Sequence, residues 1–124
     1  MDRNTLQRVT AQLLTIVLAL VFAAAGAAKL AGVETTTIAF ERLGLPWGTY
    51  LVGVLEILCA IGLFLQGFRF PAAMALVATM GGALAYHLVL DPERAFVPSL
   101  TLLVLSALLS WLRAPRKDRA PDPA

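Results

Sequence analysis

The sequence has few of the residues on which redox and metal chemistry usually depends. Among its 124 residues there is one cysteine, Cys59, and one histidine, His87. A single cysteine excludes an internal disulfide and the cysteine pair of a thiol relay, so Cys59 is expected to serve in packing. One histidine and one cysteine are too few to close a metal site. No nucleotide-binding loop or nucleophile elbow is found either, so we assign no metal ligand and no catalytic residue.

Charged residues are also scarce. They make up 15% of the chain, whereas 59% is hydrophobic and the mean hydropathy is +0.78. A soluble domain of this size could not carry such a composition, so the expected solvent is the lipid bilayer. The net charge is +2, but four of the ten basic residues lie in the last dozen positions, where membrane topology explains them better than nucleic acid does.

Four apolar runs predict an all-α protein, an integral membrane four-helix bundle. A cleaved signal peptide over residues 1–27 is a second reading, less favoured because the first run is longer than a typical signal core. The runs form one predicted transmembrane domain over residues 1–112, followed by a disordered basic cytoplasmic tail over residues 113–124. The predicted spans are about 9–30, 49–65, 71–90 and 98–112.

Basic residues predict how this bundle is oriented. With four spans, seven lysines and arginines fall on the side of the termini and three on the other. The positive-inside rule then predicts a multi-pass protein of the plasma (inner) membrane with both termini in the cytoplasm. The first outer loop, residues 31–48, fits a short helix at the membrane surface, capped by Gly44 and stopped by Pro46. An ordinary packed loop fits this segment equally well.

Three ionisable residues lie inside the apolar runs: Lys29, Glu56 and His87. Charges are costly at membrane depth, so these positions are the candidates for function. All three fall in the outer half of the bundle, with Glu56 roughly 10 Å below the surface at the rise of an α-helix. We therefore expect a polar cluster between the first three helices that binds a ligand or relays protons.

Glycines mark the faces on which these helices can approach one another. One glycine lies three residues before Lys29 and another three residues before Glu56, so each shares a helix face with its charge. Two more lie in the third run, upstream of His87. Small residues allow close helix packing in membranes, which predicts packing roles for Gly26, Gly53, Gly81 and Gly82.

Each candidate also has a purely structural interpretation. Lys29 alone is typical of a snorkelling anchor, and His87 alone of a hydrogen-bonded packing residue. A carboxylate as deep as Glu56 must be paired, protonated or placed in a polar cavity. A Glu56–Lys29 ion pair that only sets helix register is therefore a hypothesis of about the same weight as a binding site.

Several short motifs give the chain a family resemblance. They are GAAKL at 26–30, FERLGLP at 40–46, GVLE at 53–56 and YHL at 86–88, with a Gly/Ala-rich third run between the last two. In this order they resemble the DoxX-like family of small four-helix membrane proteins. The resemblance implies a four-helix bundle in which Lys29, Glu56 and His87 match the family's polar pattern.

The family takes its name from a membrane component of a thiosulfate:quinone oxidoreductase, and other members are linked to redox complexes or to receptor assembly. The resemblance therefore implies, as a first hypothesis, an accessory subunit of a redox or oxidative-stress complex whose polar cluster binds a quinone-like ligand. Its expected partners are a redox protein or a second copy of the chain. The chain has no extra domain, haem-ligand pair or cysteine pair, which argues against an autonomous enzyme.

Two alternatives come from other functional classes. The first is a non-enzymatic assembly or scaffold protein, in which the polar cluster only holds the helices in register. The second is a small proton-coupled exporter, less favoured because that design would place its glutamate in the first helix, where this chain has Lys29.

Overall fold

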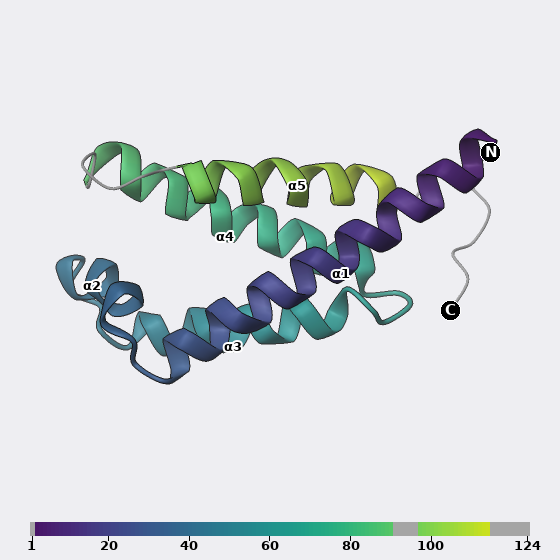
Figure 1. The fold of residues 1–124 in the computed structure, drawn as a ribbon. Helices are drawn as coiled ribbons and strands as arrows, with labels where there is room; N and C mark the ends of the chain where they lie inside the picture. The colour runs from purple at the N-terminus through teal and green to yellow at the C-terminus, as the bar shows by residue number, and fades with distance from the viewer. Residues whose placement is uncertain (1, 91–96, 115–124) are drawn as a thin grey trace.

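The computed structural model describes residues 2–90 and 97–114, and the regular secondary structure in these ranges is helical throughout (Figure 1). The predicted all-α class is thus confirmed. The predicted tail begins inside a helix at Arg113, and its residues 115–124 lie outside the described ranges. The helices are α1 (Arg3–Leu30), α2 (Glu34–Arg42), α3 (Gly48–Gly62), α4 (Arg69–Val89) and α5 (Val97–Arg113).

The four apolar runs correspond to α1, α3, α4 and α5, and only two ends differ by more than two residues. Helix α1 begins at Arg3 instead of residue 9, because the Asp2 carboxylate accepts a hydrogen bond of 2.7 Å from the Thr5 backbone N–H and caps the first turn. Helix α3 ends at Gly62 instead of residue 65. Beyond Gly62 the backbone forms hydrogen bonds between residues three apart, such as the one from the Leu65 N–H to the Gly62 carbonyl, and these end the α-helix. The apolar run therefore extends past the end of the helix.

The short helix expected in the first connection is present as α2. Gly44 follows it with φ +75°, and the Gly44 and Leu45 N–H groups donate to the carbonyls of Glu41 and Phe40 at 3.0 and 2.8 Å. This is a Schellman motif, which requires the left-handed conformation that glycine adopts without strain. Helix α2 lies beside the end of α1 and the start of α3 (Figure 1). Its position at a membrane surface stays a prediction.

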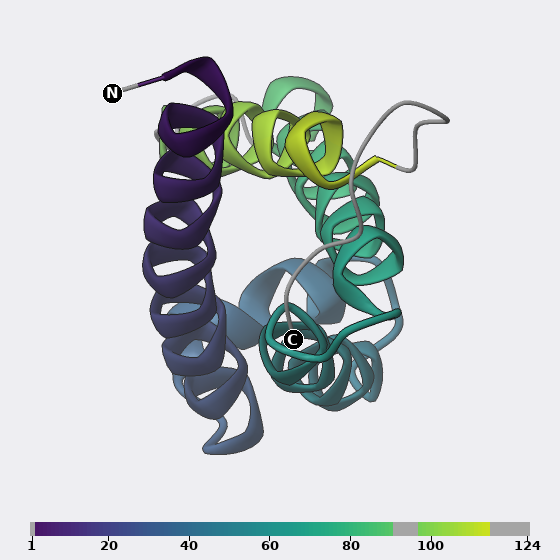
Figure 2. The ribbon, with the colours of Figure 1, turned by 90° about the vertical axis from the view of Figure 1, so that its right-hand side faces the viewer.

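Viewed along the bundle, the four long helices are arranged around a common centre in the order α1, α5, α4, α3 (Figure 2). The most extensive contacts join α1 with α3 and α4 with α5, whereas α1–α5 and α3–α4 contacts are smaller. The two pairs diverge toward the end where α2 lies, and α1 runs diagonally from its place beside α3 there to the last turns of α5 at the other end (Figure 1). We call the end where α2 lies the α2 end, and the opposite end, where α1 begins and α5 finishes, the terminal end.

The core is small and the outer surface is apolar. Leu18, Phe22, Leu63, Leu76 and Leu109 are at most 1% exposed and come from α1, the end of α3, α4 and α5. In contrast, only 28% of the most apolar 18-residue stretch of α1 is buried, and only 22% of that of α4. Both helices are long and apolar enough to cross a membrane, and α3 and α5 are shorter apolar helices. A core helix of a soluble protein would be mostly buried, so this surface fits lipid.

Candidate functional site

The candidate site begins with a close contact between α1 and α3. Gly26 and Gly53 face each other: a Cβ at Gly26 would lie 2.7 Å from the Gly53 carbonyl oxygen, and one at Gly53 would lie 3.0 Å from that of Gly26. No larger residue fits at Gly26 without a shift of backbone. The two glycines therefore bring the helix backbones together and place the side chains one turn away side by side.

Lys29 and Glu56 are those side chains. The Lys29 Nζ lies 2.9 Å from Glu56 Oε1, and the two side chains are 16% and 1% exposed. Glu56 faces inward from the middle of α3, whereas Lys29 reaches it from the last turn of α1. The pair lies in the half of the bundle nearer α2. A fully buried carboxylate is thus compensated by an ammonium group that keeps some access to the surroundings.

Buried polar atoms on the same face of α3 as Glu56 extend the site. Glu56 Oε2 has no hydrogen-bond partner among the described residues, and neither has the hydroxyl of Thr49, which is completely buried. Thr49, Gly53 and Glu56 share one face of α3 at spacings of four and three residues. Our sequence reasoning missed Thr49, although this spacing to Glu56 could have identified it.

His87 lies apart from the pair within the described residues. It is half-buried near the end of α4, and its ring meets the Tyr86 ring edge-on at a centroid distance of 5.8 Å. The structure records no ion pair or hydrogen bond from His87 to Lys29 or Glu56. The reason is that α4 packs mainly on α5 and diverges from α3 toward the α2 end. The structure thus records the Lys29–Glu56 pair without a contact to His87, and a binding or relay role for the three residues stays a prediction.

The glycines of α4 also differ from expectation. A Cβ added at Gly81 or Gly82 would meet no atom within 4 Å, and Gly82 is exposed. Neither glycine therefore lies at a helix contact within the described chain, in contrast to Gly26 and Gly53. Of the four glycines predicted to serve in packing, Gly26 and Gly53 lie at the α1–α3 contact, whereas Gly81 and Gly82 meet no atom of the described residues.

Comparison with known proteins bears on this arrangement. The model of the DoxX-like family matches residues 13–109, a range that includes Lys29, Glu56 and His87. The chain belongs to the DoxX-like family. The resemblance seen in its short motifs is thereby confirmed, and the chain is a DoxX-like membrane protein. Neither the curated proteins nor the solved structures yield a match.

The DoxX-like chain has no evident metal centre in its described part. Within residues 2–90 and 97–114, no group of three or more His, Cys, Asp and Glu side chains could hold a metal ion. The side chains of the site can form hydrogen bonds and exchange protons: they supply one carboxylate, one ammonium group and one hydroxyl. Cys59 is a free thiol, partly buried against the apolar core.

Proposed function

We propose that this DoxX-like protein is an accessory membrane subunit of a redox or oxidative-stress complex, and that the Lys29–Glu56 site binds a quinone-like amphipathic ligand. The observation that carries the proposal is the pair of unpartnered polar atoms, Glu56 Oε2 and the Thr49 hydroxyl, on one buried face of α3. Buried polar groups are nearly always hydrogen-bonded in native proteins, so such atoms favour a ligand with its own polar groups.

The donor and acceptor set fits this ligand class. The Lys29 ammonium has three donors, Thr49 can donate or accept, and the second oxygen of Glu56 can accept. A quinone or quinol offers carbonyl or hydroxyl oxygens on an apolar ring, and when bound it would supply electron transfer. Lys29 would hold a ligand oxygen, and Glu56 would accept or return a proton. The apolar surface of the helices would receive the rest of the molecule.

The proposed setting is the plasma membrane, crossed four times, with the α2 end outside and both termini in the cytoplasm. At about 1.5 Å per residue, α1 and α4 measure roughly 42 and 32 Å, enough to cross a hydrocarbon core of about 30 Å. Helices α3 and α5 measure only about 22 and 26 Å. The exposed Phe64 and Leu65 prolong the apolar surface beyond α3, and local thinning of the bilayer can accommodate the remaining mismatch.

Charge supports this orientation. Among described residues, four arginines lie toward the terminal end and only Lys29 and Arg42 toward the α2 end. An excess of basic residues marks the cytoplasmic side. The four arginines are Arg3, Arg8, Arg69 and Arg113.

The test is native mass spectrometry of the gently extracted full chain. Wild type is compared with Thr49→Val, which removes the buried hydroxyl at nearly constant volume, and with Glu56→Gln. The matched control is Thr79→Val, because the Thr79 hydroxyl already donates to the Ala75 carbonyl on α4. We expect a stoichiometric quinone-sized adduct on wild type and on the control, and its loss from both site variants.

The opposite result would contradict the ligand-binding proposal. If folded wild-type protein carries no such adduct and does not take up an added short-chain quinone, the ligand-binding proposal is wrong. The same spectra report whether a redox partner protein or a second copy of the chain remains bound.

An assembly or scaffold function is the second candidate, favoured by the 2.9 Å ion pair beside the Gly26–Gly53 contact. On this alternative the pair only holds α1 and α3 in register. Glu56→Gln would then lower the melting temperature and the recovery of a partner protein together, with no small molecule involved. Loss of the partner without loss of stability would contradict it.

A further inference from the structure

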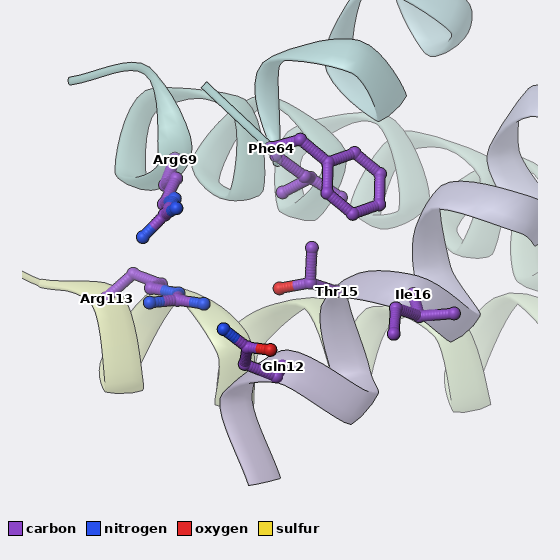
Figure 3. A pocket seen from close by; sticks show the side chains of 7 residues that line it. Gln12, Thr15, Ile16, Phe64, Arg69 and Arg113 are labelled. Carbon is purple, nitrogen blue, oxygen red and sulfur yellow. The ribbon is translucent and has the colours of Figure 1, made fainter. Parts of the chain in front are cut away.

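A polar cavity lies at the terminal end, away from the Lys29–Glu56 site. It has a volume of about 80 Å³ and opens between α1, the connection after α3, the start of α4 and the end of α5 (Figure 3). Its polar lining is supplied by Gln12, Thr15, Arg69 and Arg113. A cavity of this size with polar walls has room for several water molecules. Water can therefore enter the bundle from the terminal end.

The inner wall of this cavity belongs to an apolar layer. Leu63 lines the cavity and is only 1% exposed. Four more apolar side chains, all with no exposed surface, lie one or two helix turns inward from cavity residues of the same helices. They are Leu18 and Phe22 on α1, Leu76 on α4 and Leu109 on α5, and with Leu63 they belong to one core cluster. The layer thus receives side chains from α1, α4, α5 and the end of α3.

This layer separates the cavity from Glu56. Glu56 and Leu63 lie seven residues apart on one face of the chain, which at about 1.5 Å per residue is roughly 10 Å. The buried Ala60 lies between them. On α1, Phe22 likewise lies seven residues before Lys29 on the same face. Polar groups therefore stand on both sides of an apolar layer that is about two helix turns thick.

On the far side of the layer, polar groups continue from Glu56 toward the α2 end. The buried Thr49 hydroxyl lies two helix turns from Glu56 on the same face of α3 and has no partner among the described residues. Lys29, the charged group that faces Glu56, keeps 16% exposure in the last turn of α1. Cys59 follows three residues along α3, and no ion pair joins Glu56 to the described parts of α4 or α5. Hydrogen-bonding groups thus connect Glu56 with the α2 end.

One polar side chain lies within the layer itself. Ser106 on α5 is completely buried, and its hydroxyl has no partner in the described part of the chain. The neighbouring Ser110 adds no free donor, because its hydroxyl donates to the Ser106 carbonyl at 2.9 Å. Proton transfer needs a continuous chain of hydrogen-bonding groups or waters, and one hydroxyl does not bridge roughly 10 Å.

We propose that the apolar layer is a proton barrier, which makes Glu56 exchange protons with the α2 end only. Closely packed apolar side chains exclude water and so block ions. The inference rests on the proton-exchanging role of Glu56 in the proposed function and adds a direction to it. A proton that a ligand exchanges with Glu56 enters or leaves at the α2 end, the side proposed to be outside.

The experiment measures proton flux in proteoliposomes of the full chain, with a pH-sensitive dye inside and an imposed pH gradient. Valinomycin and potassium carry the compensating charge. Wild type and Glu56→Gln are expected to hold the gradient as well as protein-free vesicles do. Phe22→Ser replaces the largest fully buried side chain by a hydroxyl and space for water. Its flux should exceed that of wild type at least roughly tenfold, which corresponds to a barrier lowered by about 1.4 kcal/mol.

The decisive variant combines Phe22→Ser with Glu56→Gln. If protons that pass the opened layer continue through Glu56, loss of the carboxylate should return the flux to the wild-type level. Leu20→Ser is the matched control, because it places the same hydroxyl on the outer side of α1, where Leu20 is 69% exposed. Its flux should equal that of wild type. Circular dichroism melting curves establish folding, and Leu18→Ser opens the same layer at a second position.

Three results would overturn the inference. One is a wild-type flux well above that of Glu56→Gln and of protein-free vesicles, because the layer would then not stop protons. Another is a folded Phe22→Ser and a folded Leu18→Ser that are both as tight as wild type. The last is a leak through Phe22→Ser that Glu56→Gln leaves unchanged, which would mean a water-filled path that bypasses Glu56. These measurements use no quinone, so the barrier and the ligand-binding proposal succeed or fail separately.

Discussion

At the residue scale, Glu56 is a buried carboxylate whose charge needs compensation. Its carboxylate is 1% exposed and is paired with Lys29 at 2.9 Å. Removing one partner of a buried ion pair costs more than replacing both, because the remaining charge is left without compensation. Lys29 is less buried and can turn toward the surface, so the two partners are not equivalent.

The first prediction follows from this asymmetry. Lys29→Met should lower the free energy of unfolding by about 3 kcal/mol, and Glu56→Met should lower it by less. The double variant should recover most of the loss. Unfolding in detergent micelles, arranged as a double-mutant cycle, measures the coupling. Single variants as stable as wild type would show that the pair contributes nothing to the fold.

The second prediction concerns the glycines. A Cβ at Gly26 would lie 2.7 Å from the Gly53 carbonyl oxygen and from Ile57 Cγ1, so Gly26→Ala must push α1 and α3 apart. It should cost roughly 1–3 kcal/mol. Gly82→Ala is the matched control: its Cβ meets nothing, and alanine should stabilise the helix by up to about 1 kcal/mol. Equal melting temperatures for the two variants would contradict this assignment.

At the scale of helices, the stability of the first turn of α1 depends on pH. The hydrogen bond from the Thr5 backbone N–H holds the pKa of the Asp2 carboxyl below its ordinary value. A lowered pKa in the folded state means that the cap is fully stabilising above the ordinary pKa of Asp. This contribution is lost as the pH falls through the lower, folded value.

The third prediction is therefore local fraying in acid. Amide exchange of Thr5 and its neighbours in the first turn should accelerate when the pH falls below the folded pKa of Asp2. Asp2→Asn retains a capping oxygen without a titrating group, so its first turn should show no such acceleration beyond the intrinsic pH effect. NMR exchange measurements on both proteins give the comparison, and identical profiles would mean that the cap does not hold the turn.

At the scale of the whole molecule, the proposed topology predicts which connections face which side. With Cys59→Ala as background, a cysteine replacing the exposed Leu45 beyond α2 should react with a membrane-impermeant maleimide in intact cells. A cysteine replacing the exposed Gln66 between α3 and α4 should react only after permeabilisation. Labelling of both positions from the same side would mean that α3, with its 15 residues, does not cross.

The sequence could predict the depth of each site residue along its helix, but not which helices pack together at that depth. Lys29 and Glu56 were expected at similar depth, and the glycines three residues before each placed them on facing helix surfaces. Thr49 was missed because burial is a tertiary property, although its spacing to Glu56 places it on the same face of α3. His87 was expected near the pair because depth along a helix is readable from sequence, whereas the direction in which α4 leaves α3 is not.

The sequence by itself determined the helical class, the approximate extent of the long helices, the Gly44 cap and the family. These follow from local chemistry: apolar composition, glycine's access to positive φ, and short motifs. Only the tertiary structure decided that α1 pairs with α3 and α4 with α5, that His87 stands apart from Glu56, and that Arg69 and Arg113 share one cavity. The physical reason is that helix crossing angles depend on side-chain packing between distant segments, which no single run of the sequence contains.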